Sequence, residues 1–347
     1  MNLAVLDLET NGFRGTSVLS VSAIVFSHEG RILDVYDRYY FPEEQFRISA
    51  LLVNGLYPER VAFFRKARDY RSETFLEEAE DFDGFLQKWG VENVVVHNVT
   101  FDTAFLPPEI VMNRKWWCSM RGMTSHIGIC RAFGREKFPK LGELKLILQE
   151  MMEAPEETRS VERAIGEMNL YAHTSLADCL DLYGIVMRVM VNESSLLNFL
   201  PMCLCFRPPS RKYPLREGMV VPKADSFVLS HLKLKRCLDE LTGQYQFLPQ
   251  LNALIDEAEA KRDDFDPAEE QDQLLNAIRH AMAKGEKIPI RFTNISGEVT
   301  ERDVLPIGLF YSGNQLMMKA YCCLRGEDRI FNLARTELLE LGKGELS

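Results

Sequence analysis

The sequence predicts a mixed α/β domain, then a helical connector, then a small all-β domain. Three observations predict this order: strand-like and helix-like segments alternate over residues 1–190, amphipathic helical patterns follow, and short β-type segments separated by glycines fill the C-terminal end. The length of 347 residues fits this division, because one domain usually takes about 150 residues. We set the limits of the three parts at 1–192, 193–284 and 285–347.

The first part opens with two strand patterns. Residues 3–9 form a short apolar run that ends in acids, and residues 18–26 alternate as a second strand does. Aromatic and leucine side chains recur at helical intervals over 74–89 and stop before Gly90, which predicts a helix. Further patterns predict a buried strand at 94–96 and helices at 141–152 and 176–191.

The sequence pattern changes after about residue 192, where the alternation of strand-like and helix-like segments ends. Residues 207–212 contain two prolines between basic residues and predict an extended linker. Apolar stripes over 247–255 and 274–282 predict two amphipathic helices. The β-type segments are 288–293, 299–304, 307–311, 315–322 and 329–333, with Gly297 and Gly313 between them as turn residues. We expect this tail to be a small barrel or a rolled sheet.

The net charge of the chain bears on whether the protein binds nucleic acid. The chain has 41 basic and 51 acidic residues, which give a net charge of −10 and argue against binding nucleic acid by bulk positive charge. Residues 207–236 oppose this total, with eight basic and two acidic residues and a net charge of +6. We interpret this stretch either as a solvated face or as a path for phosphates. In the second interpretation the contacts are Arg211, Lys212, Lys233 and Lys235.

No sign of export or membrane insertion appears in the sequence. The N-terminal residues reach Asp7 without a basic leader. The longest uncharged stretch, 304–318, contains a proline and two glycines, whereas a membrane helix needs about 20 largely apolar residues. The eight cysteines include no Cys-x-x-Cys pair, which disfavours structural zinc and a disulfide framework. We therefore expect a cytoplasmic protein with no membrane partner.

Four carboxylates and one histidine stand at informative places in the first part. Asp7 and Glu9 are two residues apart on one predicted strand, so both side chains point to the same face. Asp102 follows the predicted strand at 94–96 closely. With a threonine or serine as N-cap, Asp178 falls in an early turn of the next helix and His173 stays in the preceding loop.

Together these residues predict a metal-dependent site. Four carboxylates in one place are costly unless cations neutralise them, and hard oxygen ligands suit Mg²⁺ or Mn²⁺. Two such ions can clamp the attacking and leaving oxygens of a phosphodiester, and His173 can take a proton from water at neutral pH. Taken singly, an Asp-x-Glu pair is usually solvated and Asp102 could be a helix cap. The order and spacing of all five residues favour the site.

The motifs are Asp7-Leu8-Glu9-Thr10, then His97-Asn98-Val99-Thr100-Phe101-Asp102, then the segment from His173 to Asp178. In this order they resemble the DEDDh 3′–5′ exonuclease superfamily over roughly residues 1–190. The segment Asn54-Gly55-Leu56 also resembles a turn that recurs between the first two motifs. One departure is Ser20-Val21, where family members commonly have Glu-Ile.

This resemblance implies a ribonuclease H-like fold with a mixed central sheet flanked by helices. It also implies that Asp7, Glu9, Asp102 and Asp178 hold two Mg²⁺ or Mn²⁺ ions and that His173 is the general base. Thr10, Asn98 and Phe101 belong to the same motifs, and we expect them to contact substrate.

The tail carries a second resemblance. The segments 297–309, Ala320-Tyr321-Cys322, Arg325-Gly326-Glu327 and 329–335 resemble the signature of a WYL domain over roughly residues 286–342. That resemblance implies an SH3-like or Sm-like β-barrel and a regulatory ligand, often a nucleic acid or a nucleotide. The name-giving Trp-Tyr-Leu is here Leu316-Met317-Met318. Arg302, Arg329 and Arg335 stand at signature positions and either bind phosphate or pair with acids of the barrel.

We therefore expect a metal-dependent 3′–5′ exonuclease acting on single-stranded 3′ ends, with DNA favoured and the WYL domain binding substrate or a regulatory ligand. An RNA-directed exoribonuclease is the alternative within this class, because both nucleic acids share the phosphodiester. A regulator that senses a nucleic acid or nucleotide with little turnover is the alternative from another class. All five catalytic positions are filled, which favours the enzyme.

Overall fold

The computed structural model describes residues 2–128, 136–166, 168, 170–171, 173–202, 206–209, 220–260, 267–294, 298–312 and 315–339. The chain divides into two units: residues 1–224 with 228–259, and residues 225–227 with 260–347. Helices that the sequence analysis assigns to one connector therefore belong to different units.

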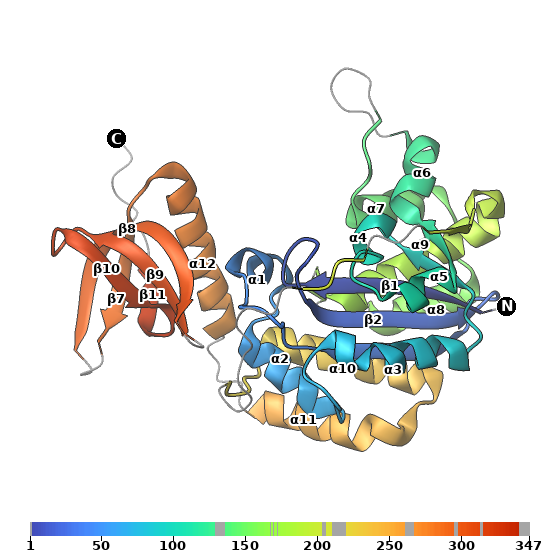
Figure 1. Cartoon of the computed structure of the whole chain (residues 1–347), viewed down its shortest axis with the longest axis horizontal. Coiled ribbons are helices and arrows are strands. Elements are labelled where there is room, and N and C mark those ends of the chain that lie inside the picture. The colour runs from blue at the N-terminus through green and yellow to red at the C-terminus, as the bar shows by residue number, and fades with distance from the viewer. Residues whose placement is uncertain are drawn as a thin grey trace. The chain divides into compact units, whose positions relative to one another are not determined.

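A mixed six-stranded sheet forms the centre of the first unit (Figure 1). Its strands are β1 (Asn2–Thr10), β2 (Val18–Ser27), β3 (Ile32–Tyr39), β4 (Asn93–Val96), β5 (Lys115–Cys118) and β6 (Leu200–Pro201), in the order β3-β2-β1-β4-β5-β6. The strands β1, β4 and β5 run parallel, while β2, β3 and β6 are antiparallel to their neighbours. Strands lie at the three predicted places, and β3, β5 and β6 are additional.

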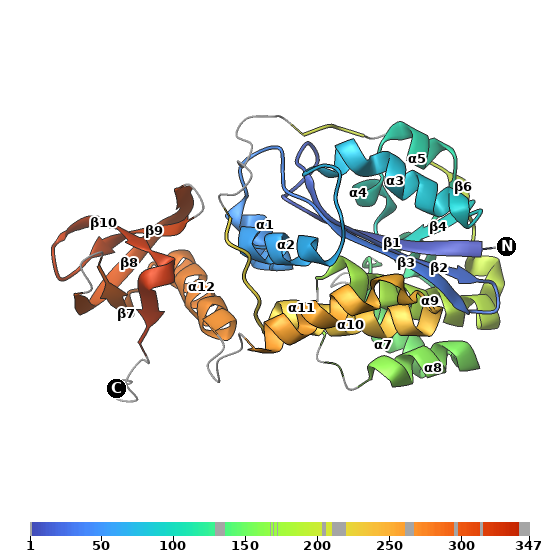
Figure 2. The same ribbon diagram turned by 90° about the horizontal axis from the view of Figure 1, so that it is seen from below.

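Helices cover both faces of this sheet (Figure 2). The helices of the unit are α1 (Ile48–Asn54), α2 (Pro58–Phe64), α3 (Phe75–Lys88), α4 (Val99–Asp102), α5 (Pro108–Met112), α6 (Ser119–Ile127), α7 (Leu141–Met151), α8 (Glu156–Ile165), α9 (Ser175–Glu193), α10 (Ser226–Thr242) and α11 (Leu248–Ala260). Side chains from α7, α8, α9 and α10 pack on one face, and side chains from α3 and α5 pack on the other. Short 3₁₀ turns occupy Arg65–Ala67, Ser194–Leu196 and Tyr245–Phe247.

The strand β1 is buried on both faces. Leu3 and Val5 belong to the core under α9, whereas Ala4 and Leu6 belong to the core under α3. Because successive side chains of a strand alternate between faces, Asp7 and Glu9 continue the row that faces α9. Within the described residues, none of the helices is long and apolar enough to cross a membrane.

The second unit contains the helix α12 (Pro267–Lys284) and a five-stranded antiparallel sheet. Its strands are β7 (Ile288–Thr293), β8 (Val299–Ser312), β9 (Gln315–Cys322), β10 (Glu327–Asn332) and β11 (Thr336–Leu338), in the order β10-β9-β8-β7-β11, with a 3₁₀ turn at Leu333–Arg335. The helix packs against β7, β8 and β11. Among the described residues β10 and β11 remain the two edges, so the sheet is not closed, and the expected barrel stays a prediction.

The long strand β8 combines the two segments predicted at 299–304 and 307–311. Its register with β9 shifts between Pro306 and Gly308. A proline has no N–H to donate to the ladder, so a local irregularity at this position is expected. The sequence pattern therefore detects the break in the ladder, although the strand itself continues.

Candidate active site

The carboxylates of the first unit come from three elements. Asp7 and Glu9 lie at the end of β1, Asp102 is the last residue of α4, and Asp178 is in the first turn of α9. Asp102 is buried with 4% of its surface exposed, and the other three are half-buried. Since β1 pairs with β4 only through Leu3–Val5, the end of β1 that carries Asp7 and Glu9 is paired with β2 alone.

Three of these side chains meet. Each of Asp7, Glu9 and Asp178 offers an oxygen atom, and these oxygens all lie within 4.8 Å of one another. Asp102 is not in this group, but its charge raises the pKa of both Asp7 and Glu9, so it acts on the same site. The structure thus brings the four predicted acids into electrostatic contact.

Burial raises the pKa of all four groups, and neighbouring acids add to this effect at Asp7, Glu9 and Asp178. Burial is the largest cause of the raised pKa of Asp7 and of Glu9, and the charge of Asp178 is the next. Burial also raises the pKa of Asp102 to about 8, and burial with the charge of Asp181 raises that of Asp178 to about 7. These groups favour a cation or a proton beside them. Clustered carboxylate oxygens are hard ligands, so the residues fit Mg²⁺ or Mn²⁺.

His173 lies two residues before the start of α9, in the loop position predicted for it. Its side chain is exposed, and its backbone has φ = 60°, which is rare for a residue other than glycine. The His173 backbone N–H donates a hydrogen bond to the Asp178 carboxylate, which offsets part of the rise in the pKa of Asp178. Thr174 is the N-cap residue, but its hydroxyl donates to Tyr171 O (3.2 Å) instead of capping the helix.

Asn54 is a supporting residue that sequence reasoning did not assign to the site. Its side chain hydrogen-bonds the Glu9 carboxylate, and Nδ2 also donates to Thr10 O (3.2 Å). The signal was present, because Asn54 begins the Asn-Gly-Leu turn noted in the sequence. Thr10 itself is buried, and its hydroxyl donates to Gly12 O (2.7 Å). The structure therefore shows Thr10 shaping the loop after β1.

The second motif shapes the surroundings of Asp102. The Asn98 backbone N–H donates to the Asp102 carboxylate and lowers its pKa against the larger effect of burial. Phe101 is half-buried and packs against Phe105 with ring centroids 5.0 Å apart. His97 contacts Ser119 Oγ through Nδ1 (2.9 Å), and burial lowers its pKa to about 4.

An exposed aromatic residue follows the first motif. Phe13, in the loop between β1 and β2, exposes 83% of its surface. Its neighbour Arg14 donates to Thr100 O (2.7 Å), which ties this loop to α4. Sequence reasoning did not single out Phe13, although an aromatic residue four positions after Glu9 is visible in the sequence.

The basic stretch divides into residues with different environments. Arg211 and Lys212 lie outside the described residues. Lys233 makes an ion pair with Glu259 (2.7 Å). Lys235 is 5% exposed and pairs with Asp239 in the same helix. The expectation that Lys235 contacts substrate is corrected on this point, because its ammonium is buried in an internal ion pair.

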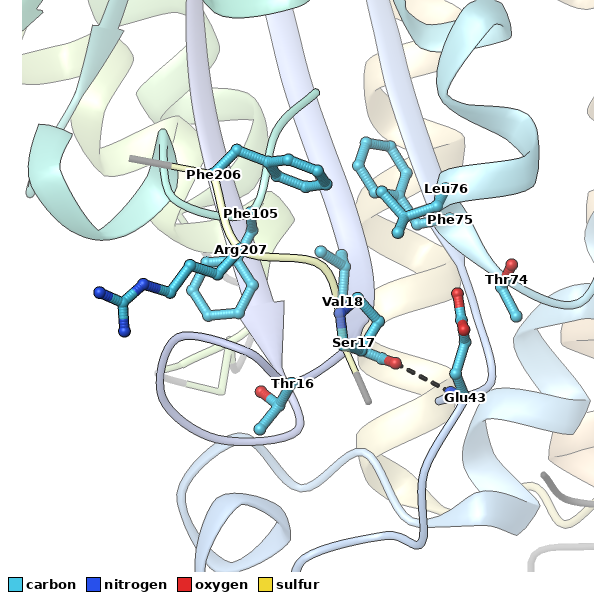
Figure 3. Close-up of a pocket in the computed structure, with 11 residues that line it drawn as sticks. Thr16, Ser17, Val18, Glu43, Thr74, Phe75, Leu76, Phe105, Phe206 and Arg207 are labelled. Atoms are coloured by element: carbon cyan, nitrogen blue, oxygen red, sulfur yellow. Dashed lines mark hydrogen bonds between the residues drawn. The ribbon is translucent and has the colours of Figure 1, made fainter. Parts of the chain in front are cut away.

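One arginine of the stretch lies beside the second motif. The Arg207 backbone N–H donates to Ala104 O (3.1 Å), two residues after Asp102. Figure 3 shows a small pocket in which Phe206 and Phe105 gather, while the Arg207 side chain points away from it. Glu43 N donates to Ser17 Oγ across the same pocket (2.8 Å). Arg207 thus presents an exposed guanidinium next to α4.

The three arginines predicted to bind a ligand in the tail do not all line the same cavity. Arg302 and Arg329 line an open cavity of about 560 Å³ in the second unit, whose described lining does not include Arg335. Phe292 and Phe331 place their ring centroids 5.8 Å from the Arg302 guanidinium carbon, and its Nε is buried with no hydrogen-bond partner in the described structure. Arg329 Nε donates to Glu327 Oε1 (2.9 Å). The cavity therefore offers two of the three predicted arginines.

Comparisons with known proteins give two kinds of match. The family model of the WYL domain matches residues 273–341, which confirms the expected domain near the C-terminal end. A search of curated proteins finds no match.

Several solved exonuclease structures are similar to this chain. Exonuclease X in complex with 5′-overhanging duplex DNA is 19% identical with a TM-score of 0.37, over 55% of this chain and 93% of that one. Exonuclease I from Methylocaldum szegediense is 17% identical with a TM-score of 0.37, over 56% and 41%. E. coli exonuclease I in complex with a dA16 oligonucleotide is 12% identical with a TM-score of 0.39, over 92% and 55%. The chain thus spans about half the length of these exonuclease I chains.

Proposed function

We propose that this chain is a metal-dependent 3′–5′ exonuclease that shortens single-stranded nucleic acid, with DNA as the favoured substrate. The observation that carries the proposal is the meeting of Asp7, Glu9 and Asp178 oxygens within 4.8 Å, with Asp102 acting on the same site. The resemblance of the three motifs to the DEDDh superfamily supplies the direction of hydrolysis and the nature of the bond.

The four carboxylates would hold two Mg²⁺ or Mn²⁺ ions in this proposal. When bound, the ions supply positive charge to the phosphodiester and make water a stronger acid. The raised pKa values of the four acids support this assignment, because burial, with repulsion from neighbouring acids at Asp7, Glu9 and Asp178, disfavours their charged forms and a bound cation offsets this cost. Asn54 keeps the Glu9 carboxylate oriented through its hydrogen bond.

His173 is the general base of the proposed reaction. An imidazole nitrogen of His173 takes a proton from the attacking water, whose oxygen forms a bond to phosphorus while the bond from phosphorus to the 3′ oxygen breaks. The released 3′ oxygen takes a proton from solvent, so the products are a nucleoside 5′-monophosphate and a shortened strand. Exposure of His173 lets it return its proton to bulk water between turnovers.

Aromatic and basic side chains near the site form the proposed path of the strand. Phe13 and Phe101 offer ring surfaces for stacking with bases, which is worth about 1–3 kcal/mol for each base. Arg207 offers a guanidinium for phosphates beside α4. These contacts act on any base and on either sugar, so the relative rates on DNA and RNA must be measured.

The test is degradation of 3′- and 5′-labelled DNA and RNA in Mg²⁺ or Mn²⁺, with EDTA as the metal-free control. We expect stepwise loss from the 3′ end, and about 10²- to 10⁴-fold less activity in His173→Asn. Asparagine is preferred to alanine because it tolerates the left-handed backbone at this position. His28→Gln is the matched control, since His28 is also exposed and lies outside the site. An intact substrate, or full activity of His173→Asn, contradicts the proposal.

A second candidate function concerns the cavity of the second unit. Its lining includes four basic residues, Arg302, Lys319, Arg325 and Arg329, and three acids, Glu298, Glu327 and Asp328. We propose that a nucleic acid or nucleotide binds there through its phosphate. In the full chain, Arg329→Ala should weaken binding of a labelled oligonucleotide or of ATP at low salt, whereas Arg291→Ala should not, because Arg291 does not line the cavity. Binding without turnover in the degradation assay would favour the regulator over the enzyme.

A further inference from the structure

A row of polar side chains crosses three strands on the face under α9. Asp7 on β1 is opposite Ser22 on β2, which is opposite Asp37 on β3. One step along, Glu9 is opposite Ser20, which is opposite Tyr39. Residues opposite one another in an antiparallel pair point to the same face. The carboxylates of the candidate site therefore share a face with a polar cluster two strands away.

Hydrogen bonds link this cluster to α9 at one end. Ser175 Oγ, from the first residue of α9, lies 2.8 Å from Ser20 Oγ and 2.7 Å from Ser22 Oγ. Ser22 Oγ donates to Asp37 Oδ1 (2.8 Å). Each of the three serines is exposed by 1% or less. The start of α9 is thus held by buried hydrogen bonds to the sheet.

The other end of the cluster is held by α10. His231 Nε2 lies 2.9 Å from Asp37 Oδ2 and 2.6 Å from the Tyr39 hydroxyl. His231 is 5% exposed and Tyr39 is 3% exposed. Burial acts to raise the pKa of Asp37, but His231, Lys235 and Ser22 outweigh it and leave this pKa below its usual value. A continuous chain of contacts therefore runs from α10 through β3 and β2 to α9.

Stability alone does not account for this chain of contacts. Buried ion pairs are often no more stabilising than apolar side chains of the same size, and they serve better to specify one arrangement. The arrangement specified here is that of the first turn of α9. Asp178 reaches the candidate site from this turn. His173 is the residue just before the N-cap residue, Thr174.

We propose that His231 and Asp37 are positioning residues of the carboxylate site, which they act on through Ser22 and Ser175. This inference rests on the proposed nuclease function and adds that α10 is an integral part of the nuclease. The helix lies on the same face of the sheet as α9 (Figure 2), and its Leu234 and Leu238 join the same core. An α/β domain that ended at residue 192 would lack both the helix and the histidine.

The test compares full-length variants at matched stability. His231→Gln removes the imidazole that contacts Asp37 and Tyr39, and Ser22→Ala removes one hydroxyl from the middle of the chain of contacts. Arg114→Gln is the control, because Arg114 also makes a buried ion pair, with Asp83 (2.6 Å), on an element outside the cluster. The measurements are Tm, the affinity for Mn²⁺, and kcat and KM on single-stranded DNA.

We expect His231→Gln to lower kcat and Mn²⁺ affinity about 10- to 100-fold, with KM changed by less than about threefold. Arg114→Gln should lose a similar amount of Tm and keep kcat within about twofold of wild type. Equal kcat loss in both variants, or wild-type kcat in His231→Gln, overturns the proposal. If His231→Gln does not fold, Ser22→Ala decides by the same criteria. A wild-type protein without nuclease activity overturns the proposed function instead, and the two failures are thereby distinguished.

Discussion

Asp7 and Asp37 lie two strands apart in one row of the sheet, yet the pKa values of their carboxyl groups shift in opposite directions. Burial and three neighbouring acids raise the pKa of Asp7. Asp37 is the more buried of the two, yet the charges of His231 and Lys235 lower its pKa. The difference lies in the charges nearby, because burial acts on both groups alike.

This contrast separates two uses of a buried acid. At the Asp37 end the protein supplies its own partners, because His231, Lys235 and Ser22 together lower the pKa of Asp37 against its burial. At the Asp7 end acids surround one another. The charge of Lys145 acts to lower the pKa of Asp178, but this pKa stays above its usual value. An acid cluster of this kind is balanced by ions from solution. In the proposed function, the Asp37 end is the supporting end of the row and the Asp7 end is the reacting end.

The largest expected effect comes from a change at the reacting end. Asp102→Asn should reduce nuclease activity about 10³-fold, since it removes charge that the transition state requires. The same change should raise the Tm of the metal-free protein by an amount that grows between about pH 4, where unfolded carboxyls ionise, and about pH 8, and it should leave Tm unchanged below about pH 4. Activity assays and thermal melts with Asp69→Asn, an exposed aspartate, provide the comparison. A fall in Tm at pH 8.5 would contradict this account.

The supporting end should respond with the opposite sign. Asp37→Asn should lower the free energy of unfolding by about 3 kcal/mol, because it removes the buried carboxylate that His231 and Ser22 contact. Urea denaturation at pH 7 measures this loss. An Asp37→Asn protein as stable as Asp102→Asn would abolish the distinction between the two ends.

Metal and pH should act on the reacting end alone. The folded state keeps protons on Asp102 and Asp178 up to about pH 8 and 7, while unfolded carboxyls release them near pH 4, so the stability of the metal-free protein should fall as pH rises from 5 to 8. Mg²⁺ at 100 times its Kd should restore about 2.7 kcal/mol. Melts across this pH range, with KCl at equal ionic strength as control, test both statements. Stability that rises with pH without metal would be inconsistent with them.

The smallest effect is expected at the residue that orients Glu9. Asn54→Ala removes a hydrogen bond to this carboxylate and should weaken Mn²⁺ binding and activity about 10- to 100-fold. Titration with Mn²⁺ shows whether the lost activity returns at high metal concentration, as it should when only affinity is reduced. A loss that excess Mn²⁺ leaves unchanged would point to a different role.

The sequence predicted the reacting end far better than the supporting end. Asp7, Glu9 and Asp178 could be placed because each stands at a recognisable strand end or helix start, and motif order brought them together. Asp37 and His231 are 194 residues apart and belong to no motif, so nothing local marks their contact. Pairing over such a distance depends on how β3 and α10 pack, which one sequence does not reveal.

The helix α10 shows why a charge count misleads. Its lysines suggested a solvated face or a path for phosphates, and the segment was not predicted as a helix. The structure buries Lys235 against Asp239 one turn away, while Leu234 and Leu238 enter the core. A basic residue on the inner face of a helix looks the same in sequence as one on the outer face until its acidic partner is identified.

The left-handed backbone at His173 has an evolutionary consequence. A side chain with a Cβ pays roughly 1–2 kcal/mol to adopt this conformation, whereas glycine adopts it freely and asparagine at reduced cost. Neither glycine nor asparagine can accept a proton as imidazole does. Under the proposed mechanism, selection for folding alone would therefore replace the histidine, whereas selection for hydrolysis would keep it. If His173 is the general base, the residue at this position should distinguish descendants that hydrolyse nucleic acid from those that have kept only the fold.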